Sequence, residues 1–243
     1  MRLHEQTVAV VGGGSGIGKA IAAQSVAAGA NVIISSRNIA NLDKTVAEIG
    51  AGSAIPVDMT QPDAVAAWVH ALPEIDHLVI SASSAAHGRF SDLTDESLRH
   101  MFDAKFFGPY TVAKAALSRI RPGGSITFFS GVLSRRPGMN CSGLGAVNGA
   151  VEALTRGLAL ELGPDLRVNC LSPGMVRSDA YAAMETEARE TMYEATGESL
   201  PVGRVGTVEE TAEAAIFLMT NAYTTGVVLD VDGGHMIRQY AHR

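Results

Sequence analysis

The sequence predicts a single α/β domain built on a doubly wound, parallel, seven-stranded sheet with helices on both faces. Short apolar runs rich in Val and Ile alternate along the chain with longer stretches of helical periodicity. This alternation is typical of a parallel sheet, because strands covered by helices on both sides are buried along their whole length. The chain has 243 residues, of which 47% are hydrophobic, and no linker or internal repeat divides it. We therefore expect one domain over residues 1–243.

The first strand is expected over residues 7–11, where apolar and β-branched residues lead into a glycine-rich turn. A helix follows through Ala28, and a more polar helix is expected over residues 39–49. The remaining strands share Val/Ile-rich composition and short length. We place them at residues 31–35, in a short strand ending at Asp58, and at residues 77–81, 125–129, 167–171 and 227–231. Helices fill the intervals between them.

The composition excludes several classes of function. The chain carries 19 Lys and Arg against 25 Asp and Glu, a net charge of −6, and it has no basic run. Nucleic acid and anionic membrane surfaces are therefore not expected partners. The two cysteines, Cys141 and Cys170, suit neither a disulfide framework nor a metal site. Since no apolar stretch suits a signal peptide or a membrane span, we expect a cytoplasmic protein.

A glycine-rich turn lies directly between the first strand and the first helix and reads Gly12-Gly-Gly-Ser-Gly-Ile-Gly18. The first glycine permits a tight turn, Gly16 lets the backbone approach a diphosphate, and Gly18 allows close helix packing. The helix N-terminus presents unpaired N–H groups and the positive end of its dipole to phosphate groups. A glycine-rich turn alone is weak evidence, but its position between strand and helix strongly indicates dinucleotide binding.

These features resemble the short-chain dehydrogenase/reductase family, and the resemblance covers about residues 5–234. The spacing of the glycines is that of the family, and Asp58 stands where the family places an aspartate against the adenine ring. Residues 167–174 match its segment around a Pro-Gly turn beside the nicotinamide, and residues 203–234 match its C-terminal pattern. The resemblance implies a Rossmann-type fold, an NAD(P) cofactor, a small-molecule substrate and a homo-oligomer, either a tetramer or a dimer.

The resemblance also implies which residues contact the cofactor. They belong to the glycine turn, the end of the second strand, the residues after the third and fourth strands, the position of a family lysine, and the turn after the sixth strand. The set is Gly12, Gly14, Ser15, Gly16, Ile17, Gly18, Ser36, Arg37, Asp58, Met59, Ala82, Asn148, Pro173, Gly174, Val176 and Ser178. A substrate-covering lid is expected over residues 178–200, and no metal is implied.

The end of the second strand favours NADP(H) over NAD(H). An acidic residue there would bind a ribose 2′-hydroxyl group and repel a 2′-phosphate. The strand instead ends in Ser35, Ser36 and Arg37, without a carboxylate. Ser36 can donate a hydrogen bond, and Arg37 can form a charge-assisted pair with a phosphate. The alternative is that Arg37 only stacks on the adenine ring, which family members that bind NAD(H) also allow.

The resemblance implies four catalytic residues, and all four positions carry other residue types here. In the family a tyrosine passes the proton, a lysine lowers its pKa, a serine polarises the carbonyl group and an asparagine anchors a water relay. In this sequence Gly131 stands at the serine position and Leu144 at the tyrosine position. Asn148 stands at the lysine position and Lys105 at the asparagine position. Ordinary alcohol dehydrogenation is therefore not expected.

One segment does spell Tyr-x-x-x-Lys, from Tyr110 to Lys114, but its context does not fit. It precedes the fifth strand, on the helix that contains Lys105. Tyr110 lies five residues beyond Lys105, about 140° round the helix, so the two side chains point in different directions. No lysine follows Lys114, which excludes a shifted pair downstream. We interpret Tyr110 as a packing residue.

Lysine and asparagine have exchanged places at positions 105 and 148, which leaves two interpretations open. A lysine in a largely apolar site loses solvation free energy unless it finds a partner or gives up its proton. Lys105 can therefore extend toward Asn148 and the cofactor ribose and supply a cation there. Alternatively, the Lys105 side chain reaches solvent or binds a backbone carbonyl group.

Redox chemistry without the tyrosine would need another proton donor. His87 is the leading candidate, because an imidazole group exchanges protons near neutral pH. Ser142 and Cys141 are expected beside the same pocket, and Tyr181 lies on the expected lid. Each also has a purely structural interpretation: a solvated loop residue for His87, a helix N-cap for Ser142, a small buried residue for Cys141 and lid packing for Tyr181.

Three functions remain open at this point. An NADP(H)-dependent oxidoreductase with a non-standard active site could reduce an activated C=O, C=C or C=N bond, since general acid–base catalysis contributes only about 10²–10⁴-fold. The alternatives are a catalytically inactive NADP(H)-binding pseudoenzyme, acting as a sensor or subunit, and a non-redox enzyme built on the same fold. Arg135 and Arg136 could pair with an anionic substrate or could simply be solvated.

Overall fold

The computed structural model describes residues 3–81 and 86–238 and has the expected doubly wound architecture. Seven strands form one sheet in the order β3-β2-β1-β4-β5-β6-β9, and all neighbours pair in parallel. The strands are β1 (Thr7–Val11), β2 (Asn31–Ser35), β3 (Ser53–Ala54), β4 (Ile75–Ile80), β5 (Ile120–Phe129), β6 (Arg167–Pro173) and β9 (Val228–Val231). The strand order reverses between β1 and β4, which is where sheets of this kind bind ligands, at the carboxyl ends of the strands.

The third strand is shorter than expected, because its regular ladder covers only Ser53–Ala54. Pairing nevertheless continues, since the N–H groups of Ile55 and Val57 each donate to a carbonyl group at the end of β2 at 3.0 Å. Pro56, between them, has no N–H group and lies on the edge strand of the sheet, where a proline is tolerated. This continued pairing brings Asp58 beside the end of β2.

Two other strands begin earlier than the sequence predicts. β4 starts at Ile75 and β5 at Ile120, and these two residues pair with one another. The register of the two strands then shifts between Ile75 and His77. The irregularity interrupts the apolar pattern, which is why the sequence indicates only the later part of each strand. The first and second helices end within one residue of their expected positions.

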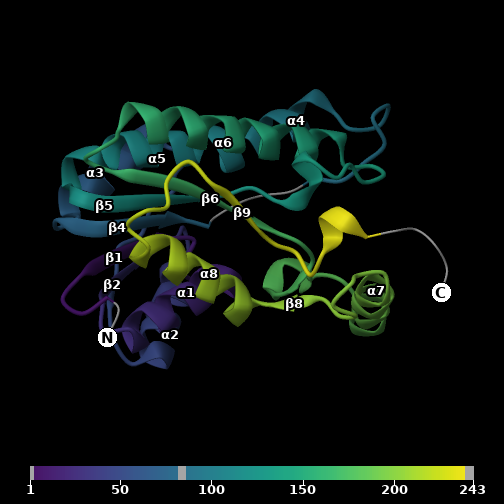
Figure 1. The fold of residues 1–243 in the computed structure, drawn as a ribbon, viewed down its shortest axis with the longest axis horizontal. Helices are drawn as coiled ribbons and strands as arrows, with labels where there is room; N and C mark the ends of the chain where they lie inside the picture. Colours follow the sequence, from purple (N-terminus) through teal and green to yellow (C-terminus); the bar gives the residue numbers. More distant parts are fainter. Residues whose placement is uncertain (1–2, 82–85, 239–243) are drawn as a thin grey trace.

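Helices cover both faces of the sheet, as Figure 1 shows. On one face lie α1 (Gly16–Ala27), α2 (Ile39–Ile49) and α8 (Val208–Thr220), and on the other lie α3 (Pro62–Ala71), α5 (Gly108–Ala116) and α6 (Ser142–Glu161). Each layer buries its own apolar cluster against the sheet. α4 (Asp95–Phe102) runs into α5 through a π-helical segment, Asp103–Phe107. Within the described residues, a membrane-spanning helix is not found, since none combines the required length and hydropathy.

The chain after β6 folds into elements that the sequence analysis did not separate. β7 (Val176–Arg177) pairs with β8 (Gly206–Thr207) in a small parallel sheet of two strands. Between them lie a 3-10 turn, Asp179–Tyr181, and α7 (Thr186–Glu198). Figure 1 shows α7 at one end of the main sheet, beyond the label of β8. The segment expected to form a lid therefore contains a helix of its own.

Candidate functional site

The turn between β1 and α1 requires glycine for steric and conformational reasons. A Cβ atom on Gly18 would lie 2.1 Å from the carbonyl oxygen of Gly12 and 2.6 Å from Ser81 Oγ. Gly12 and Gly16 have φ angles of 91° and 51°, in the left-handed region that favours glycine. α1 begins at Gly16, with Ser15 as its N-cap residue. The turn therefore exposes the N-terminus of α1 to close approach by a ligand.

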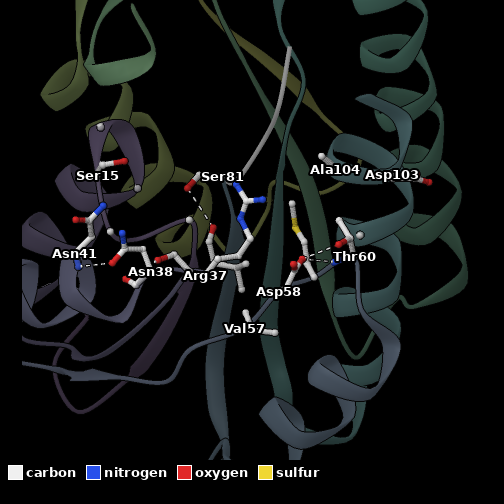
Figure 2. Close-up of a pocket in the computed structure, with 18 of the residues that line it drawn as sticks. Ser15, Arg37, Asn38, Asn41, Val57, Asp58, Thr60, Ser81, Asp103 and Ala104 are labelled. Carbon is white, nitrogen blue, oxygen red and sulfur yellow. Dashed lines mark hydrogen bonds between the residues drawn. The ribbon is translucent and has the colours of Figure 1, made fainter. Parts of the chain in front are cut away.

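A cleft of about 890 Å³ opens at the carboxyl ends of β1 and β2, a volume typical of small-molecule and cofactor sites. Its wall combines the glycine turn, the end of β2, residues 57–62, the start of α5 and residues 178–180. Figure 2 shows side chains from these separate segments facing the same space. The predicted cofactor residues that line it are Gly12, Gly14, Ser15, Gly16, Ile17, Gly18, Ser36, Arg37, Asp58, Met59 and Ser178.

Arg37 directs its guanidinium group into this cleft, as Figure 2 shows. Beside it, the hydroxyl group of Ser36 donates to the carbonyl oxygen of Asn38 at 3.4 Å. Asn38 caps α2 by accepting a hydrogen bond from the N–H group of Asn41 at 3.1 Å. Asn38 and Asn41 also line the cleft. Neither asparagine was predicted as a site residue, although an asparagine before an apolar helical pattern is a signal for an N-cap. This wall offers a cation, a hydroxyl group and two amides to a ligand.

Asp58 is held as a carboxylate by its neighbour Thr60. Its Oδ1 accepts hydrogen bonds from Thr60 Oγ1 at 2.7 Å and from the Thr60 N–H group at 3.0 Å. The hydroxyl bond, followed by the backbone bond, lowers the pKa of Asp58 below its ordinary value, and the positive charge of Arg37 acts in the same direction. Thr60 lines the cleft but was not predicted from the sequence.

An acidic side chain that the sequence analysis did not single out lies at the glycine turn. Asp179 Oδ2 accepts a hydrogen bond from the N–H group of Gly16 at 3.2 Å, although the two residues are 163 positions apart. Ser178 is the N-cap of the 3-10 turn that carries Asp179, and its Oγ accepts from the Ala180 N–H group at 3.4 Å. A Cβ atom on Gly16 would lie 3.9 Å from Ser178 Cβ. Residues 178–180 therefore form the wall of the cleft over the N-terminus of α1.

Lys105 and Asn148 meet at the end of β5. Lys105 Nζ donates to the carbonyl oxygen of Ser130, and Asn148 Nδ2 donates to the next carbonyl oxygen, that of Gly131, each at 3.3 Å. Lys105 is only 7% exposed, so its side chain does not reach solvent. Burial lowers the pKa of the Lys105 ammonium group to about 8. Lys105 therefore binds a backbone carbonyl group, as one interpretation expected, and its reach toward the cofactor ribose stays a prediction.

Asn148 keeps one acceptor without a partner. Its Oδ1 is buried, and no donor among the described residues reaches it. Buried polar atoms in proteins are nearly always hydrogen-bonded. This atom therefore keeps an acceptor capacity that the described side chains do not use.

Leu144 belongs to an apolar cluster and lies on the same helix, α6, as Asn148. Leu144 is 8% exposed and packs against Met101 and Val147 in a cluster that also includes Leu98, Phe102, Phe106 and Leu133. A Cβ atom on Gly131 would lie 3.1 Å from Asn148 Nδ2, so a larger residue there would crowd the amide group. Neither Gly131 nor Leu144 carries a hydroxyl group. A proton donor for chemistry at this place must come from other residues.

A charged network that the sequence did not indicate lies behind the end of β5. Glu152, which is 4% exposed, accepts hydrogen bonds from Ser130 Oγ at 3.1 Å and from Ser134 Oγ. Arg135 Nε lies 3.4 Å from Glu152 Oε2, and Arg135 also donates to Asp230 Oδ2 at 2.9 Å. Arg135 thus pairs with two carboxylates of the protein itself. The sequence had suggested either an anionic substrate or solvent as its partner. Because Glu152 and Asp230 come from α6 and β9, only the fold brings them to it.

His87 and Cys141 come together although they are 54 residues apart. His87 Nδ1 lies 3.4 Å from Cys141 Sγ, and the Gly88 N–H group donates to the Asn140 carbonyl oxygen at 3.0 Å. These contacts join the loops that follow β4 and β5. Burial raises the pKa of the Cys141 thiol. Ser142 is exposed and is the first residue of α6, so the N-cap expected at Ser142 lies one residue earlier, at Cys141.

Two further sequence interpretations concern tyrosines. Tyr181 packs edge-to-face against Tyr193 of α7, with ring centroids 5.9 Å apart. Burial raises the pKa of Tyr181, with smaller contributions from Tyr193 and Cys141. Tyr110 is 40% exposed, and the ammonium group of Lys114 lies 5.9 Å from its ring centroid. Tyr110 is thus a half-exposed residue of α5 whose ring packs against the Lys114 side chain.

Residues 11–236 match the protein family described as Enoyl-(Acyl carrier protein) reductase. Short-chain dehydrogenase/reductase ATR9 of Stachybotrys chlorohalonatus is 31% identical to the chain over 252 residues, which cover 97% of the chain and 99% of that relative. The chain belongs to the short-chain dehydrogenase/reductase family. The family predicted from the glycine turn and the C-terminal patterns is therefore confirmed.

Solved structures of this family confirm the Rossmann-type fold. A small-chain dehydrogenase in complex with NADPH has 34% sequence identity and a TM-score of 0.84, with 96% of this chain and 99% of that chain covered. The MalC Reductase/Diels-Alderase from Malbranchea aurantiaca has 26% identity and a TM-score of 0.91, with 98% of each chain covered.

The remaining predicted positions of this short-chain dehydrogenase/reductase lie beyond the cleft that holds Arg37. Pro173 ends β6 and pairs with Val231 of β9, whose carbonyl oxygen accepts from the Gly174 N–H group at 3.0 Å. A Cβ atom on Gly174 would lie 2.9 Å from the Cα atom of Asp232. Val176 belongs to β7. Four other predicted site residues do not line that cleft: Lys105, Asn148, His87 and Ser142. Ala82 is not among the residues that the structure describes.

Proposed function

We propose that this short-chain dehydrogenase/reductase is an NADP(H)-dependent oxidoreductase with a non-standard active site, which reduces an activated C=O, C=C or C=N bond in a small-molecule substrate. The observation that carries the proposal is the buried amine of Lys105, with its pKa lowered to about 8, at the carboxyl edge of a sheet whose glycine turn is intact. A protein that needed only a scaffold would gain nothing from burying this cation.

The chain's own residues fit the two ends of the cofactor. The turn around Gly18 leaves no room for a Cβ atom, and Arg37 faces the cleft without a competing carboxylate at the end of β2. At the other end, the unused Asn148 Oδ1 can accept from a ribose hydroxyl group. The small-chain dehydrogenase that is similar to this chain was solved with NADPH, which supports the same choice here. When bound, the cofactor supplies the hydride.

The proposed active site lacks the phenol on which ordinary members depend. We propose that Leu144, Gly131, Asn148 and Lys105 occupy the four catalytic positions of the family. With a pKa of about 8, most Lys105 side chains carry a proton at neutral pH, so the ammonium group can stabilise negative charge that develops on the substrate. The His87–Cys141 pair, outside the apolar cluster, is our candidate for the group that holds a proton for transfer.

Exposed apolar side chains on the loops of His87 and Cys141 support an apolar substrate. Phe90 and Met139 are each 88% exposed, and they lie on the two loops that the His87–Cys141 contact joins. Exposed large apolar side chains beside a site lose contact with water when a ligand covers them, which favours ligands with apolar groups. Together with the apolar cluster around Leu144, this arrangement favours apolar enones, imines and aldehydes over polyols.

Single-turnover kinetics test the proposal. Purified protein loaded with NADPH is mixed with a panel of a cyclic enone, an aliphatic aldehyde and a cyclic imine, and NADPH absorbance is followed by stopped flow. We expect oxidation with at least one substrate, and we expect Lys105→Met to slow it by about 100-fold. Lys114→Met is the matched control, because Lys114 is an exposed lysine on the neighbouring helix α5. Tight NADPH binding without oxidation of any substrate would contradict the proposal and favour a pseudoenzyme that acts as a sensor or subunit.

A non-redox function is the second candidate, and a specific observation favours it. Leu144 and its apolar neighbours could fold an apolar substrate into a reactive conformation without any proton transfer. The MalC protein, which is similar over 98% of the chain, is described as a reductase and a Diels-Alderase. A cyclisation that proceeds equally well with NADPH and without it, on an apolar diene substrate, would support this candidate.

A further inference from the structure

The N-terminus of α1 already holds an anion that belongs to the chain. Asp179 Oδ2 accepts the hydrogen bond of the Gly16 N–H group at 3.2 Å, and Asp179 lines the cleft together with Ser178. The first N–H groups of a helix have no partner within the helix, and the positive end of the dipole favours a negative group there. A carboxylate at this place therefore makes the same kind of contact as an oxygen of a bound diphosphate.

We infer that Asp179 is an internal competitor for the diphosphate of the cofactor, and that it sets the affinity of this site. The inference rests on the proposed function, which assigns a dinucleotide to the cleft, and it deepens that function by naming the residue that limits its binding. Two negative groups cannot share one helix N-terminus without mutual repulsion. The dinucleotide must therefore move the Asp179 carboxylate away from Gly16 when it binds.

Displacement of Asp179 also affects the segment expected to form a lid. The 3-10 turn of Asp179 begins at Ser178, whose backbone N–H and carbonyl groups lie 3.4 and 3.5 Å from the hydroxyl oxygen of Tyr193 on α7. Tyr193 is 2% exposed, and the guanidinium group of Arg177 lies 4.6 Å from its ring centroid. A shift of the turn therefore reaches α7 through a packed side chain. Cofactor binding and the arrangement of residues 178–200 are coupled, because each favours a different position of Asp179.

Dissociation constants for two ligands test the competition. Asp179→Asn removes the charge and keeps a hydrogen-bond acceptor, so it should bind NADPH with a dissociation constant about five times lower than the parent protein. The second ligand, 2′-AMP, has the 2′-phosphate that Arg37 would bind but no diphosphate, and its affinity should not change. Glu187→Gln is the matched control, because Glu187 is an exposed carboxylate in the first turn of α7 of the same segment. Asp179→Ala, which also removes the acceptor, should bind NADPH at least as tightly as Asp179→Asn.

Hydrogen exchange tests the coupling without any turnover. NADPH should increase amide exchange in α7 of the parent protein, whereas Asp179→Asn should show the faster exchange before NADPH is added.

Equal or weaker NADPH binding by both Asp179 variants would overturn the inference while leaving the proposed function intact. Unchanged exchange in α7 on NADPH binding would overturn the coupling. Failure of every variant and of the parent protein to bind NADPH would overturn the inference together with the proposed function.

Discussion

Lys105 is the residue on which the proposed chemistry depends, and its burial has a cost in stability. Its amine is buried and, among the described residues, donates a hydrogen bond to the Ser130 carbonyl oxygen. Desolvation of the charged form is what lowers its pKa to about 8. A side chain that destabilises the fold persists where it serves a function, so the cost itself supports an active role.

Lys105→Met should reveal this cost as a dependence of stability on pH. The folded protein binds the Lys105 proton with a pKa of about 8, whereas the unfolded chain binds it near the ordinary value of about 10.4. The unfolded state therefore holds more protons between these values, and stability rises with pH across that window. Relative to Lys105→Met, the free energy of unfolding of the parent protein should rise by up to about 3 kcal/mol between pH 8 and 10.5. The free energy of unfolding of each protein is measured with urea at several pH values. If it changes with pH equally in the two proteins over this window, the Lys105 ammonium group is not desolvated in the folded state.

At the scale of elements, the turn between β1 and α1 determines whether a diphosphate can approach the backbone. The turn combines two left-handed glycines with the close contact of Gly18 and the carbonyl group of Gly12. The neighbouring strand pairing places Asp58 and Arg37 on the other wall. Binding of the cofactor thus depends on the relative positions of β1, α1 and β2 rather than on any single side chain.

Gly18→Ala should disturb this arrangement. Its Cβ atom would lie 2.1 Å from the Gly12 carbonyl oxygen, a backbone atom that can move only if the turn moves. We expect NADPH affinity to fall by about 100-fold or more, since displacements of about 1 Å at such sites have effects of that size. Gly149→Ala on α6 is the control, because no atom lies within 4 Å of the Cβ position there. Calorimetric titration with NADPH makes the comparison, and equal affinities of the two variants would refute the steric argument.

At the scale of the whole molecule, the sheet holds a histidine that must stay neutral. His77 is 3% exposed, its Nδ1 lies 2.8 Å from Ser125 Oγ, and its Nε2 lies 3.2 Å from Gln6 Oε1. Burial lowers the pKa of His77 to about 4, and the positive charge of Arg167 contributes to the shift. Two neutral partners satisfy the neutral ring, so protonation would place an unpaired charge between the strands.

Stability should therefore fall as the pH drops from about 6.5 to 4. In this window the unfolded chain binds a proton at His77 and the folded protein does not, which favours unfolding. The effect of this one residue reaches up to about 3 kcal/mol at pH 4. His77→Gln lacks the titrating ring, so its free energy of unfolding should depend less on pH over the same range. Chemical denaturation at half-unit pH steps provides the comparison, and identical slopes for both proteins would disprove it.

We propose that the protein is a homo-oligomer, either a tetramer or a dimer, that associates through α5 and α6. Phe107 and Leu160 on this side of the molecule are 54% and 84% exposed, and apolar side chains of this size are common in subunit interfaces. Sedimentation velocity should show an oligomer for the parent protein and a smaller species for Leu160→Glu. Phe90→Ser, in the loop before α4, should leave the oligomer unchanged. A monomeric parent protein would contradict the proposal.

Local patterns explain why most of the fold could be predicted. The strands were predicted from short Val/Ile-rich runs. The glycine turn was predicted from the glycines of residues 12–18, which a tight turn and close helix packing require. Ser36 and Arg37 could be named because they follow a predicted strand, and Asp58 could be named from the family resemblance at the end of the next strand. The edge strand was harder to delimit, since Pro56 interrupts its ladder while pairing continues to Val57.

The parts of the site that the sequence did not reveal are contacts between distant segments. Gly16 and Asp179 are 163 residues apart, and Arg135 and Asp230 are 95 residues apart. No local pattern marks Asp179 as a residue of the glycine turn, because the resemblance places it only at the start of the expected lid. The pairing of His87 with Cys141 was likewise suggested only as a shared pocket, and its geometry required the packing of two loops.

Dissociation constants of NADPH and NADH, measured in parallel on the purified protein, test whether the cleft selects NADP(H). We expect NADPH to bind at least ten times more tightly, because Arg37 faces the cleft and no carboxylate stands at the end of β2 to repel a 2′-phosphate. Arg37→Gln should reduce this preference while leaving NADH binding nearly unchanged. Equal affinities, or tighter binding of NADH, would refute the role of Arg37 in selecting NADP(H).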